Sequence, residues 1–310
     1  MIIHHGIQDH AIRRPVVTLG SFDGVHRGHL SVIEALEETA ALLDGEPVVV
    51  TFDPHPREVL YPMERKPGIL TTLDEKAALL ERRGVTHLIV LPFTAGLGEL
   101  GYADFVERVL VGAIGIKGLV VGYDHRFGKG REGNYENLRQ MAERLDFFLR
   151  QVPALEMNDA SVSSTKIRDA LATGNIRLVN ALLGYRYPLT GKVVPGERLG
   201  RRIGFPTANL HVEDARKSLP ATGVYAVEAT VAGETACGLL NVGTRPTVST
   251  SGSLSIEAHL LDFHRDLYGE YLTIHLVDRL RGERKFENVG ELQKQLELDK
   301  ETAFACLSTQ

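Results

Sequence analysis

The sequence predicts an α/β protein with two folded regions: an N-terminal region built on a parallel sheet, and a small antiparallel C-terminal region with a closing helix. In the first region, short apolar runs alternate with helical patterns, which is typical of a parallel sheet covered on both faces. In the second, short alternating runs are divided by Gly and Pro, and no helical pattern intervenes until the end, so an antiparallel barrel or sandwich is expected. Because the pattern changes between about residues 175 and 188, we expect domains at residues 1–184 and 185–310.

The composition is that of an ordinary globular protein. Of the 310 residues, 43% are hydrophobic and 24% charged, and the net charge of −5, with no basic tail, argues against nucleic acid as a partner. Cys237 and Cys306 are far apart in sequence, which favours a reducing, cytoplasmic location over a disulfide scaffold. No signal-peptide pattern and no apolar run near the roughly 20 residues of a membrane helix is present, so no membrane association is expected. The sequence leaves the oligomeric state, self-association included, open.

In the first region, the strands are expected where the chain is most continuously apolar, at residues 16–19, 48–52, 88–91, 119–121 and 147–152. The helices between them are expected at residues 30–43, 73–83, 105–111 and 136–145, followed by further helices running to about residue 171 and over residues 176–183. Thr72 and Glu75 form a capping box at the start of one of these helices. In the second region, the strands are expected at residues 191–194, 226–231, 239–242, 256–261 and 271–276, and the closing helix over 289–303.

A tight glycine-bearing turn, residues 20–29, separates the first of these strands from a helix. Such a turn directs backbone N–H groups and a helix N-terminus at one spot, which suits an anion. His26 and His29 stand three residues apart where the helix begins, so both can reach that spot. Three interpretations follow: a glycine turn with surface histidines, a zinc-binding histidine pair, or a site for nucleotide phosphates.

Three further loops are expected at the same edge of the sheet, beyond the carboxyl ends of the strands. Residues 53–56 are stiffened by two prolines, and residues 122–133 are glycine-rich and basic. Residues 162–168 place Ser, Thr, Lys and Arg at a helix start, where they either cap the helix or face phosphate oxygens. Each loop alone is compatible with an ordinary surface turn, but four such loops at one edge favour a binding site.

The segment FDGVHRGH at residues 22–29 resembles the HxGH signature of the nucleotidyltransferase superfamily, in the form found in the FMN adenylyltransferase domain of bacterial FAD synthetases. The other three loops resemble, in order, that family's FDPHP, GxDFxFGxxxxG and SSTxIR segments. The resemblance implies a Rossmann-like nucleotidyltransferase domain in which His26 and His29 are catalytic. It implies ATP and phosphate contacts at Gly20, Phe22, Asp23, Gly28, Ser163, Ser164, Thr165, Lys166 and Arg168, and flavin contacts at Pro54, Pro56 and Asp124. His125 stands where the family often has an aromatic residue, which leaves the flavin-side contacts of this loop open. Lys166 stands where the family often has Arg, which keeps the charge but not the bidentate hydrogen bonding of Arg.

The second region carries its own candidate site at residues 200–209. Its glycines let the backbone approach a ligand closely, and Thr207 and Asn209 lie two residues apart, so in an extended segment their side chains face the same way. Such oxygen ligands suit Mg²⁺ bound together with phosphate. Taken alone, the run is equally compatible with a polar turn, and Glu257 with a solvated strand residue.

The run resembles the GRxLGFPTANL signature of riboflavin kinases, and residues 241–247 and 256–259 resemble later segments of that family. This implies a riboflavin-kinase-type barrel with Glu257 as the catalytic base, Thr207 and Asn209 as Mg²⁺ ligands, and nucleotide or flavin contacts at Gly200, Gly204, Pro206 and Arg281. Pro195 replaces a His that the family often has.

Together, the two resemblances imply an FAD biosynthesis enzyme that converts riboflavin to FMN and FMN to FAD, with ATP as the second substrate of each step. Two other classes remain: a flavin-binding carrier or regulator without turnover, and a metal-dependent hydrolase that uses His26, His29 and His55.

Overall fold

The chain folds into two compact units, and each is described by itself. The computed structural model describes residues 1–7, 11–61, 68–153, 156–157, 160–196, 200, 203–231, 233–244, 254–263 and 265–308. Unit 1 comprises Met1–Pro67 and Thr71–Ser164, and unit 2 comprises Gly68–Leu70 and Thr165–Gln310. The second compact unit therefore includes a short segment from the N-terminal half of the sequence.

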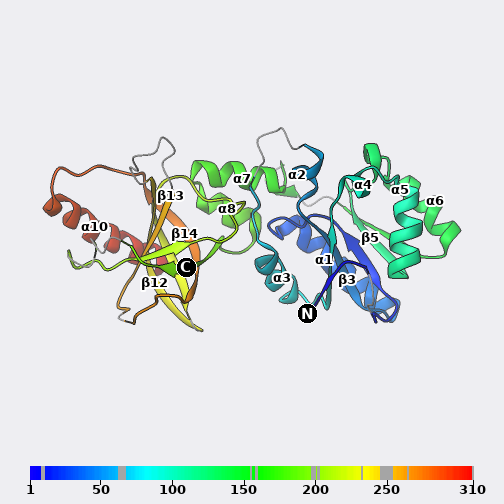
Figure 1. Ribbon diagram of the computed structural model, residues 1–310, viewed down its shortest axis with the longest axis horizontal. Helices are drawn as coiled ribbons and strands as arrows, with labels where there is room; N and C mark the ends of the chain where they lie inside the picture. The colour runs from blue at the N-terminus through cyan, green and yellow to red at the C-terminus, as the bar shows by residue number, and fades with distance from the viewer. Residues whose placement is uncertain are drawn as a thin grey trace. The chain divides into compact units, whose positions relative to one another are not determined.

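Unit 1 contains a six-stranded sheet in the order β1-β4-β3-β2-β5-β6, in which every paired strand is parallel (Figure 1). Its strands are β1 (Ile2–His5), β2 (Val16–Leu19), β3 (Pro47–Asp53), β4 (His87–Pro92), β5 (Gly118–Gly122) and β6 (Phe148–Val152). The predicted parallel sheet is confirmed, and the edge strand β1 is an addition that the apolar runs did not predict.

Both faces of this sheet are covered, because consecutive strand residues enter different hydrophobic clusters. Val16 packs with helix residues on one side, whereas Val17 packs with a separate cluster on the other. The first cluster receives α1 (Arg27–Leu42) and α3 (Leu73–Glu81), and the second receives the π-helical η1 (Phe105–Ile114) and α6 (Tyr135–Leu145). The shorter elements are α2 (Pro56–Leu60), α4 (Ala95–Gly98), α5 (Tyr102–Asp104), the 3₁₀ turn η2 (Lys129–Arg131), and the two-residue strands β7 (Glu156–Met157) and β8 (Ala160–Ser161).

The strand order reverses beside β2, which fixes where a ligand can enter. After β2 the chain moves through β3 to β4, and it then returns to the other side of β2 as β5. In such doubly wound sheets, ligands bind beyond the carboxyl ends of the strands at this reversal. The loops after β2, β3 and β5 all leave that edge because the strands are parallel, as the sequence predicted.

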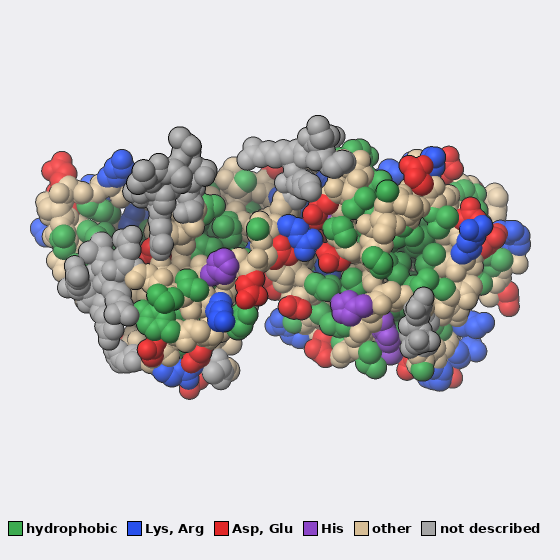
Figure 2. All heavy atoms as spheres, in the orientation of Figure 1, with side chains coloured by type: hydrophobic (Ala, Val, Ile, Leu, Met, Phe, Trp, Pro, Cys, Tyr) green, Lys and Arg blue, Asp and Glu red, His purple; other side chains and the backbone are tan. Residues whose placement is uncertain are grey.

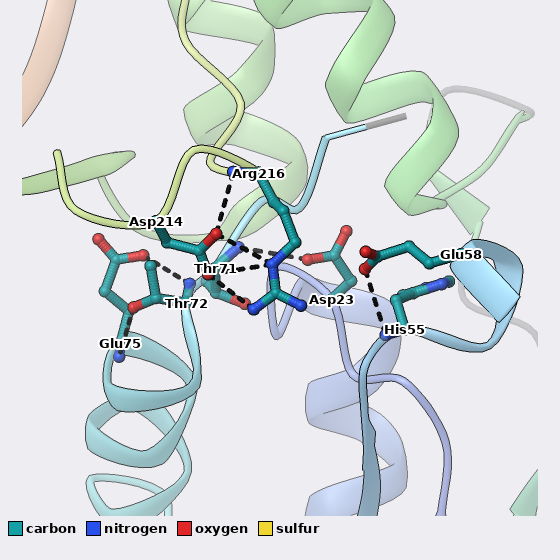
Figure 3. Close-up of polar contacts among 8 residues, drawn as sticks. All are labelled: Asp23, His55, Glu58, Thr71, Thr72, Glu75, Asp214 and Arg216. Atoms are coloured by element: carbon teal, nitrogen blue, oxygen red, sulfur yellow. Dashed lines mark hydrogen bonds and ion pairs between the residues drawn. The ribbon is translucent and has the colours of Figure 1, made fainter. Parts of the chain in front are cut away.

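Local chemistry explains why α3 begins where it does. Thr72 Oγ1 accepts a hydrogen bond from the N–H of Glu75 at 3.3 Å, and Glu75 Oε2 accepts one from the N–H of Thr72 at 3.0 Å (Figure 3). This is the predicted capping box, which satisfies two N–H groups that a helix start leaves without intrahelical partners.

Unit 2 contains a closed antiparallel barrel in the order β10-β13-β12-β11-β14-β9, so of the two expected architectures the barrel is the one observed. Its strands are β9 (Pro188–Val194), β10 (Ala208–His211), β11 (Gly223–Val231), β12 (Glu234–Thr244), β13 (Leu254–Leu260) and β14 (Tyr271–Arg281). The helices that the structure describes beside it in sequence are α7 (Ser164–Thr173), α8 (Ile176–Leu183) and α10 (Val289–Ser308). The helix expected over residues 176–183 and the closing helix are both confirmed.

The outer face of the barrel is partly covered by α10. Ala303 of this helix is fully buried in a cluster with Val224, Leu239 and Val277 of the barrel strands. Arg281 at the end of β14 also forms an ion pair with the buried Asp299 of α10, with Nη2 and Oδ2 2.8 Å apart. Apolar packing and a buried ion pair therefore hold the closing helix against the strands.

The surface carries both signs of charge. On the face drawn in Figure 2, Lys and Arg side chains alternate with Asp and Glu, and no continuous basic stripe is visible among the residues described. Within the part of the chain that the structure describes, no helix combines the length and apolar character needed to cross a membrane.

Candidate active sites

The loop after β2 has an unusual backbone. Phe22 and Val25 have φ angles of +45° and +35°, and Gly24 between them has +84°. A positive φ is costly for residues with a Cβ, above all for a β-branched one, and such conformations persist only where the surroundings enforce them. Here both side chains are almost completely buried, so the hydrophobic core enforces this shape.

Hydrogen bonds inside unit 1 fix the same loop from two sides, and Figure 3 shows the one between Asp23 and Thr71. The buried Asp23 accepts a bond from the N–H of Thr71 at Oδ1, and the N–H of Gly24 donates to Thr71 Oγ1 at 3.1 Å. From the other side, Ser164 Oγ donates to the carbonyl oxygen of Asp23 at 2.9 Å. The predicted phosphate loop is thus bonded to Ser164, another of the predicted phosphate residues.

His26 and His29 stand at the N-terminus of α1 with their rings stacked, the ring centroids 3.6 Å apart. Gly28 makes room for this stack, because a Cβ at that position would lie 3.3 Å from the His26 ring. The buried Nδ1 of His29 has no hydrogen-bond partner among the residues that the structure describes. A buried polar atom at a helix N-terminus that is directed at no protein group is suited to a bound anion.

Burial determines the protonation state of His29. Desolvation is the largest cause that holds the pKa of His29 well below its usual 6.5, and the charges of His26 and Lys76 lower this pKa further. The His29 imidazole is therefore neutral at pH 7 in the free protein, where it can donate a hydrogen bond from one nitrogen only.

The loops after β3 and β5 carry the predicted flavin residues. Pro54 is exposed and follows a cis peptide bond, Pro56 is half-buried at the start of α2, and Asp124 is exposed. His125 lies 5.5 Å from Phe127 between ring centroids, so it takes part in an aromatic cluster although it is not itself a Phe or Tyr. Burial lowers the pKa of His125 to about 4, with Arg131 adding to this shift and Asp124 opposing it.

His55 has a structural role that conflicts with the hydrolase alternative. Its Nδ1 accepts a hydrogen bond from the N–H of Arg57, and its own N–H donates to Glu58 Oε1 at 3.3 Å, which caps α2 (Figure 3). Among the described residues, no group of three or more His, Cys, Asp and Glu side chains could hold a metal ion. The metal site that His26, His29 and His55 would need is therefore not formed.

The remaining predicted phosphate residues follow one another at the start of α7. Ser163 precedes the helix, and Thr165, Lys166 and Arg168 occupy its first two turns. Thr165 and Lys166 are exposed, whereas Arg168 is half-buried. Gly20, at the end of β2, is half-buried and donates its N–H to the carbonyl oxygen of Val50.

Lys76 of α3 also lies near this site, although no motif in the sequence predicted it. Its side chain is only 8% exposed, and its ammonium donates to the carbonyl oxygen of Ser21 at 2.7 Å and to Thr51 Oγ1 at 3.1 Å. The signal was present, because Lys76 falls on the apolar stripe of its helix between Leu73 and Leu80.

In unit 2, the predicted kinase residues come together on adjacent strands. Glu257 of β13 pairs in register with Asn209 of β10, and Glu257 Oε2 accepts a hydrogen bond from Thr207 Oγ1 at 3.3 Å. Residues directly opposite on paired strands share one face of a sheet. The Thr207 hydroxyl and the Asn209 amide thus lie near the Glu257 carboxylate at one point of the barrel wall, and hydroxyl and amide oxygens are ligands that fit Mg²⁺.

This point lies on the outer face of the barrel. His259 pairs in register with Leu239, which belongs to the cluster covered by α10. Glu257 lies two residues before His259 and therefore on the same face, whereas Ile256 and Ala258 are buried on the inner face. Polar and apolar side chains therefore divide between the two faces of β13.

Glycines bring the chain close to these oxygens. A Cβ at Gly196 would lie 2.1 Å from Asn209 Nδ2, and one at Gly200 would lie 2.2 Å from the carbonyl oxygen of Phe205. Gly204 has a φ of +85° and completes this turn. Pro206 follows, and its carbonyl oxygen accepts a bond from His259 Nδ1 at 2.8 Å, so that nitrogen carries a proton.

Other predicted segments are placed only in part. Arg281 is bound by Asp299, as described above, and Pro195 is exposed at the end of β9. Residues 201–202 and 245–247, which belong to the two kinase-like segments, lie outside the described residues.

A Rossmann-like sheet with a histidine loop at its point of reversal, joined to a small barrel with a carboxylate on its outer face, is the architecture of a two-domain transferase. Two family models match the chain, one for FAD synthetase at residues 8–166 and one for riboflavin kinase at residues 183–307. The chain belongs to the family of bifunctional riboflavin kinase/FMN adenylyltransferases.

Curated relatives match over nearly the full chain. The bifunctional riboflavin kinase/FMN adenylyltransferase of Pseudomonas fluorescens is 38% identical, over 92% of this chain and 90% of its own length. The protein of the same name from Bacillus subtilis is 36% identical, over 98% of this chain and 96% of its own. A crystal structure described as a macrolide-efflux protein from Streptococcus pneumoniae matches with a TM-score of 0.89 and 31% identity, covering 98% of this chain and 99% of that one.

Proposed function

We infer that this chain is a bifunctional transferase of FAD biosynthesis, which phosphorylates riboflavin with ATP to give FMN and then adenylylates FMN with a second ATP to give FAD and pyrophosphate. The match of both family models, in this order along one chain, is the observation that carries the inference. We assign adenylyl transfer to residues 1–184 and the kinase reaction to residues 185–310, and we place the enzyme in the cytoplasm, in keeping with the free thiols of Cys237 and Cys306.

In adenylyl transfer, an FMN phosphate oxygen attacks the α-phosphorus of ATP, and the bond from that phosphorus to the β-phosphate bridging oxygen breaks. No covalent enzyme intermediate is needed, so the protein contributes positioning and charge stabilisation. His26 and His29 at the N-terminus of α1 would bind the phosphates, and Lys166 and Arg168 of α7 would balance the charge on the departing pyrophosphate. The phosphates would also contact Gly20, Phe22, Asp23, Gly28, Ser163, Ser164 and Thr165.

The flavin of FMN would lie against the loops after β3 and β5, with contacts to Pro54, Pro56 and Asp124. The apolar and aromatic side chains beside these residues support this placement, because Phe52 and Phe93 pack edge to face with their centroids 5.5 Å apart. A flat isoalloxazine ring is suited to such a surface.

In the kinase reaction, the 5′-hydroxyl of riboflavin attacks the γ-phosphorus of ATP while Glu257 accepts the hydroxyl proton, and ADP leaves. Thr207 and Asn209 would hold Mg²⁺, which neutralises phosphate charge when bound. Gly200, Gly204 and Pro206 would let the backbone approach the nucleotide or flavin, and a ligand contact of Arg281 stays a prediction beside its ion pair.

The test supplies the purified chain with riboflavin, ATP and Mg²⁺, and in parallel with FMN, ATP and Mg²⁺. We expect FMN and FAD in the first reaction and FAD in the second. A protein that binds the flavins but forms neither product would instead be a carrier.

A further inference from the structure

A buried lysine of α3 contacts the loop that carries the two histidines, and the roles assigned so far make no use of it. Lys76 occupies a position on the buried face of its helix, where Ala77 and Leu80 are also buried. Burying an ammonium group costs free energy unless the group is well hydrogen-bonded. Positions where a chain breaks the local pattern in this way are often functional ones.

The contacts of Lys76 form a closed triangle inside unit 1. Its Nζ donates to the carbonyl oxygen of Ser21 and to Thr51 Oγ1, and Thr51 Oγ1 in turn donates to the same Ser21 oxygen at 3.2 Å. Thr51 is fully buried in β3. The triangle therefore fixes the peptide between Ser21 and Phe22, in the loop after β2, to the central strand β3 and to α3.

The residue that follows Ser21 is Phe22, which has a positive φ and packs against His29 with the ring centroids 5.0 Å apart. A shift of the Ser21 carbonyl would therefore be passed through Phe22 to the imidazole. We propose that Lys76 is a positioning residue for adenylyl transfer, which holds the Ser21 carbonyl so that Phe22 and the loop keep His29 directed at the ATP phosphates. This inference rests on the proposed adenylyltransferase function.

Lys76 also affects His29 electrostatically. The groups that act on this imidazole are His26 on the same turn and Lys76 from α3, and each lowers the pKa of His29 in addition to burial. The carboxylate of Asp23, in the same loop, accepts a hydrogen bond from the N–H of Thr71. Removing the Lys76 charge should therefore raise the His29 pKa in part, since burial remains.

The experiment compares Lys76→Met and Lys76→Arg with Lys217→Met as the matched control. Lys217 is also a buried lysine, 5% exposed, and its Nζ also donates to a backbone carbonyl at 2.7 Å, that of Leu70, but it lies in unit 2. FAD formation from supplied FMN, FMN formation from riboflavin, and the NMR titration of His29 are measured for each variant.

We expect Lys76→Met to slow FAD formation on the order of 10²-fold, as misplacement of a reacting group by about 1 Å does. FMN formation should be unchanged, and the His29 titration should move upward. Lys76→Arg should retain the lowered His29 pKa and should form FAD faster than Lys76→Met does. Lys217→Met should change neither FAD formation nor the titration of His29. Wild-type FAD formation and an unshifted His29 titration in Lys76→Met would overturn the proposal.

A second variant covers the case in which Lys76→Met impairs folding of unit 1. Thr51→Val removes the hydroxyl that shares the Ser21 carbonyl without removing a charge, and it should slow FAD formation as well. If both residues act through that carbonyl, the double variant should be little slower than Lys76→Met alone, whereas losses that multiply would contradict the proposal. A wild-type chain that forms no FAD would refute the proposed function itself, which keeps the two failures distinct.

Discussion

The neutral state of His29 in the free protein has a consequence for ATP binding. A bound polyphosphate places negative charge beside the imidazole, and opposite charge favours the protonated form. We expect ATP binding to raise the His29 pKa, so that the protein takes up protons when it binds ATP near pH 6. Calorimetry in buffers of different ionisation enthalpy measures this uptake. His29→Ala should abolish it, and an equal uptake in that variant would assign the proton to another group.

The same histidine offers a direct test of catalysis. Loss of one preorganised hydrogen-bond donor typically costs about 10²–10³-fold in rate. His29→Ala should therefore reduce FAD formation by about 10²-fold or more, while FMN formation should stay at the wild-type level because we assign it to the other unit. An equal loss of both activities would point to misfolding or to a shared site.

His125 predicts how the stability of unit 1 changes with pH. Its pKa in the folded state is about 4, below the 6.5 of an unperturbed imidazole, so the unfolded state binds more protons between these values. The stabilising effect of neutral burial is thus present above pH 6.5 and is lost progressively as the pH falls toward 4. His125→Phe should make the unfolding free energy less dependent on pH in this range, as denaturant titrations at pH 7 and pH 5 would show. If the unfolding free energy of His125→Phe depended on pH as it does in the wild type, a group other than His125 would cause the acid sensitivity.

At the scale of single elements, β13 presents Glu257 and His259 outward and Ile256 and Ala258 inward. Glu257→Gln keeps the size of the side chain but cannot accept a proton, and loss of a general base typically costs about 10²–10⁴-fold. We expect FMN formation to fall within that range, with riboflavin binding and FAD formation from FMN near wild type. If Glu257→Gln phosphorylated riboflavin at the wild-type rate, Glu257 would not be the general base, and Mg²⁺ and substrate positioning would account for the catalysis.

The ion pair between Arg281 and Asp299 predicts how α10 is held. Breaking a buried pair typically costs about 3–5 kcal/mol, and because the Arg281 side chain is 20% exposed we expect Asp299→Asn to cost near the lower end, about 3 kcal/mol. The double variant Arg281→Met with Asp299→Leu should recover much of this loss. A stable double variant that forms no FMN would support the predicted ligand contact of Arg281.

Periodicity and turn chemistry predicted most elements but missed several of the short ones. The helix over residues 176–183 was predicted to the residue, because an apolar stripe, Asn175 and Gly184 mark its face and both ends. Strands β1 and β10 have only four residues each, and the polar residues of β10 hide any alternation. The glycine-containing loops of both sites were predicted for the same reason as this helix, because their residue types specify the local backbone geometry.

Contacts between distant parts of the sequence could not be predicted from such local patterns. Arg281 and Asp299 meet only because α10 folds back on the barrel, and Ser164 and Asp23, 141 residues apart in sequence, meet only because unit 1 folds. The triangle formed by Lys76, Thr51 and Ser21 joins three separate elements. Local propensity does not encode such pairings; they follow from the tertiary fold.

At the scale of the whole molecule, the compact unit around the barrel begins before residue 185. The side chain of Asn180 donates to the carbonyl oxygen of Leu276 and accepts the N–H of Tyr187, each at 2.9 Å, so α8 is bonded to the strands. A fragment of residues 165–310 should therefore unfold at a higher temperature than one of residues 185–310, and it should form FMN but no FAD. Equal melting temperatures would show that α7 and α8 contribute nothing to the barrel.

We infer that one chain performs two successive transfers in two separate sites. The most direct measurement follows riboflavin, FMN and FAD over time after the wild-type chain is mixed with riboflavin, ATP and Mg²⁺, alongside the His29→Ala and Glu257→Gln variants. The account predicts that the wild type forms FMN and then FAD, that His29→Ala accumulates FMN, and that Glu257→Gln forms FAD only when FMN is supplied. Loss of both products in either variant, with the fold intact, would contradict it.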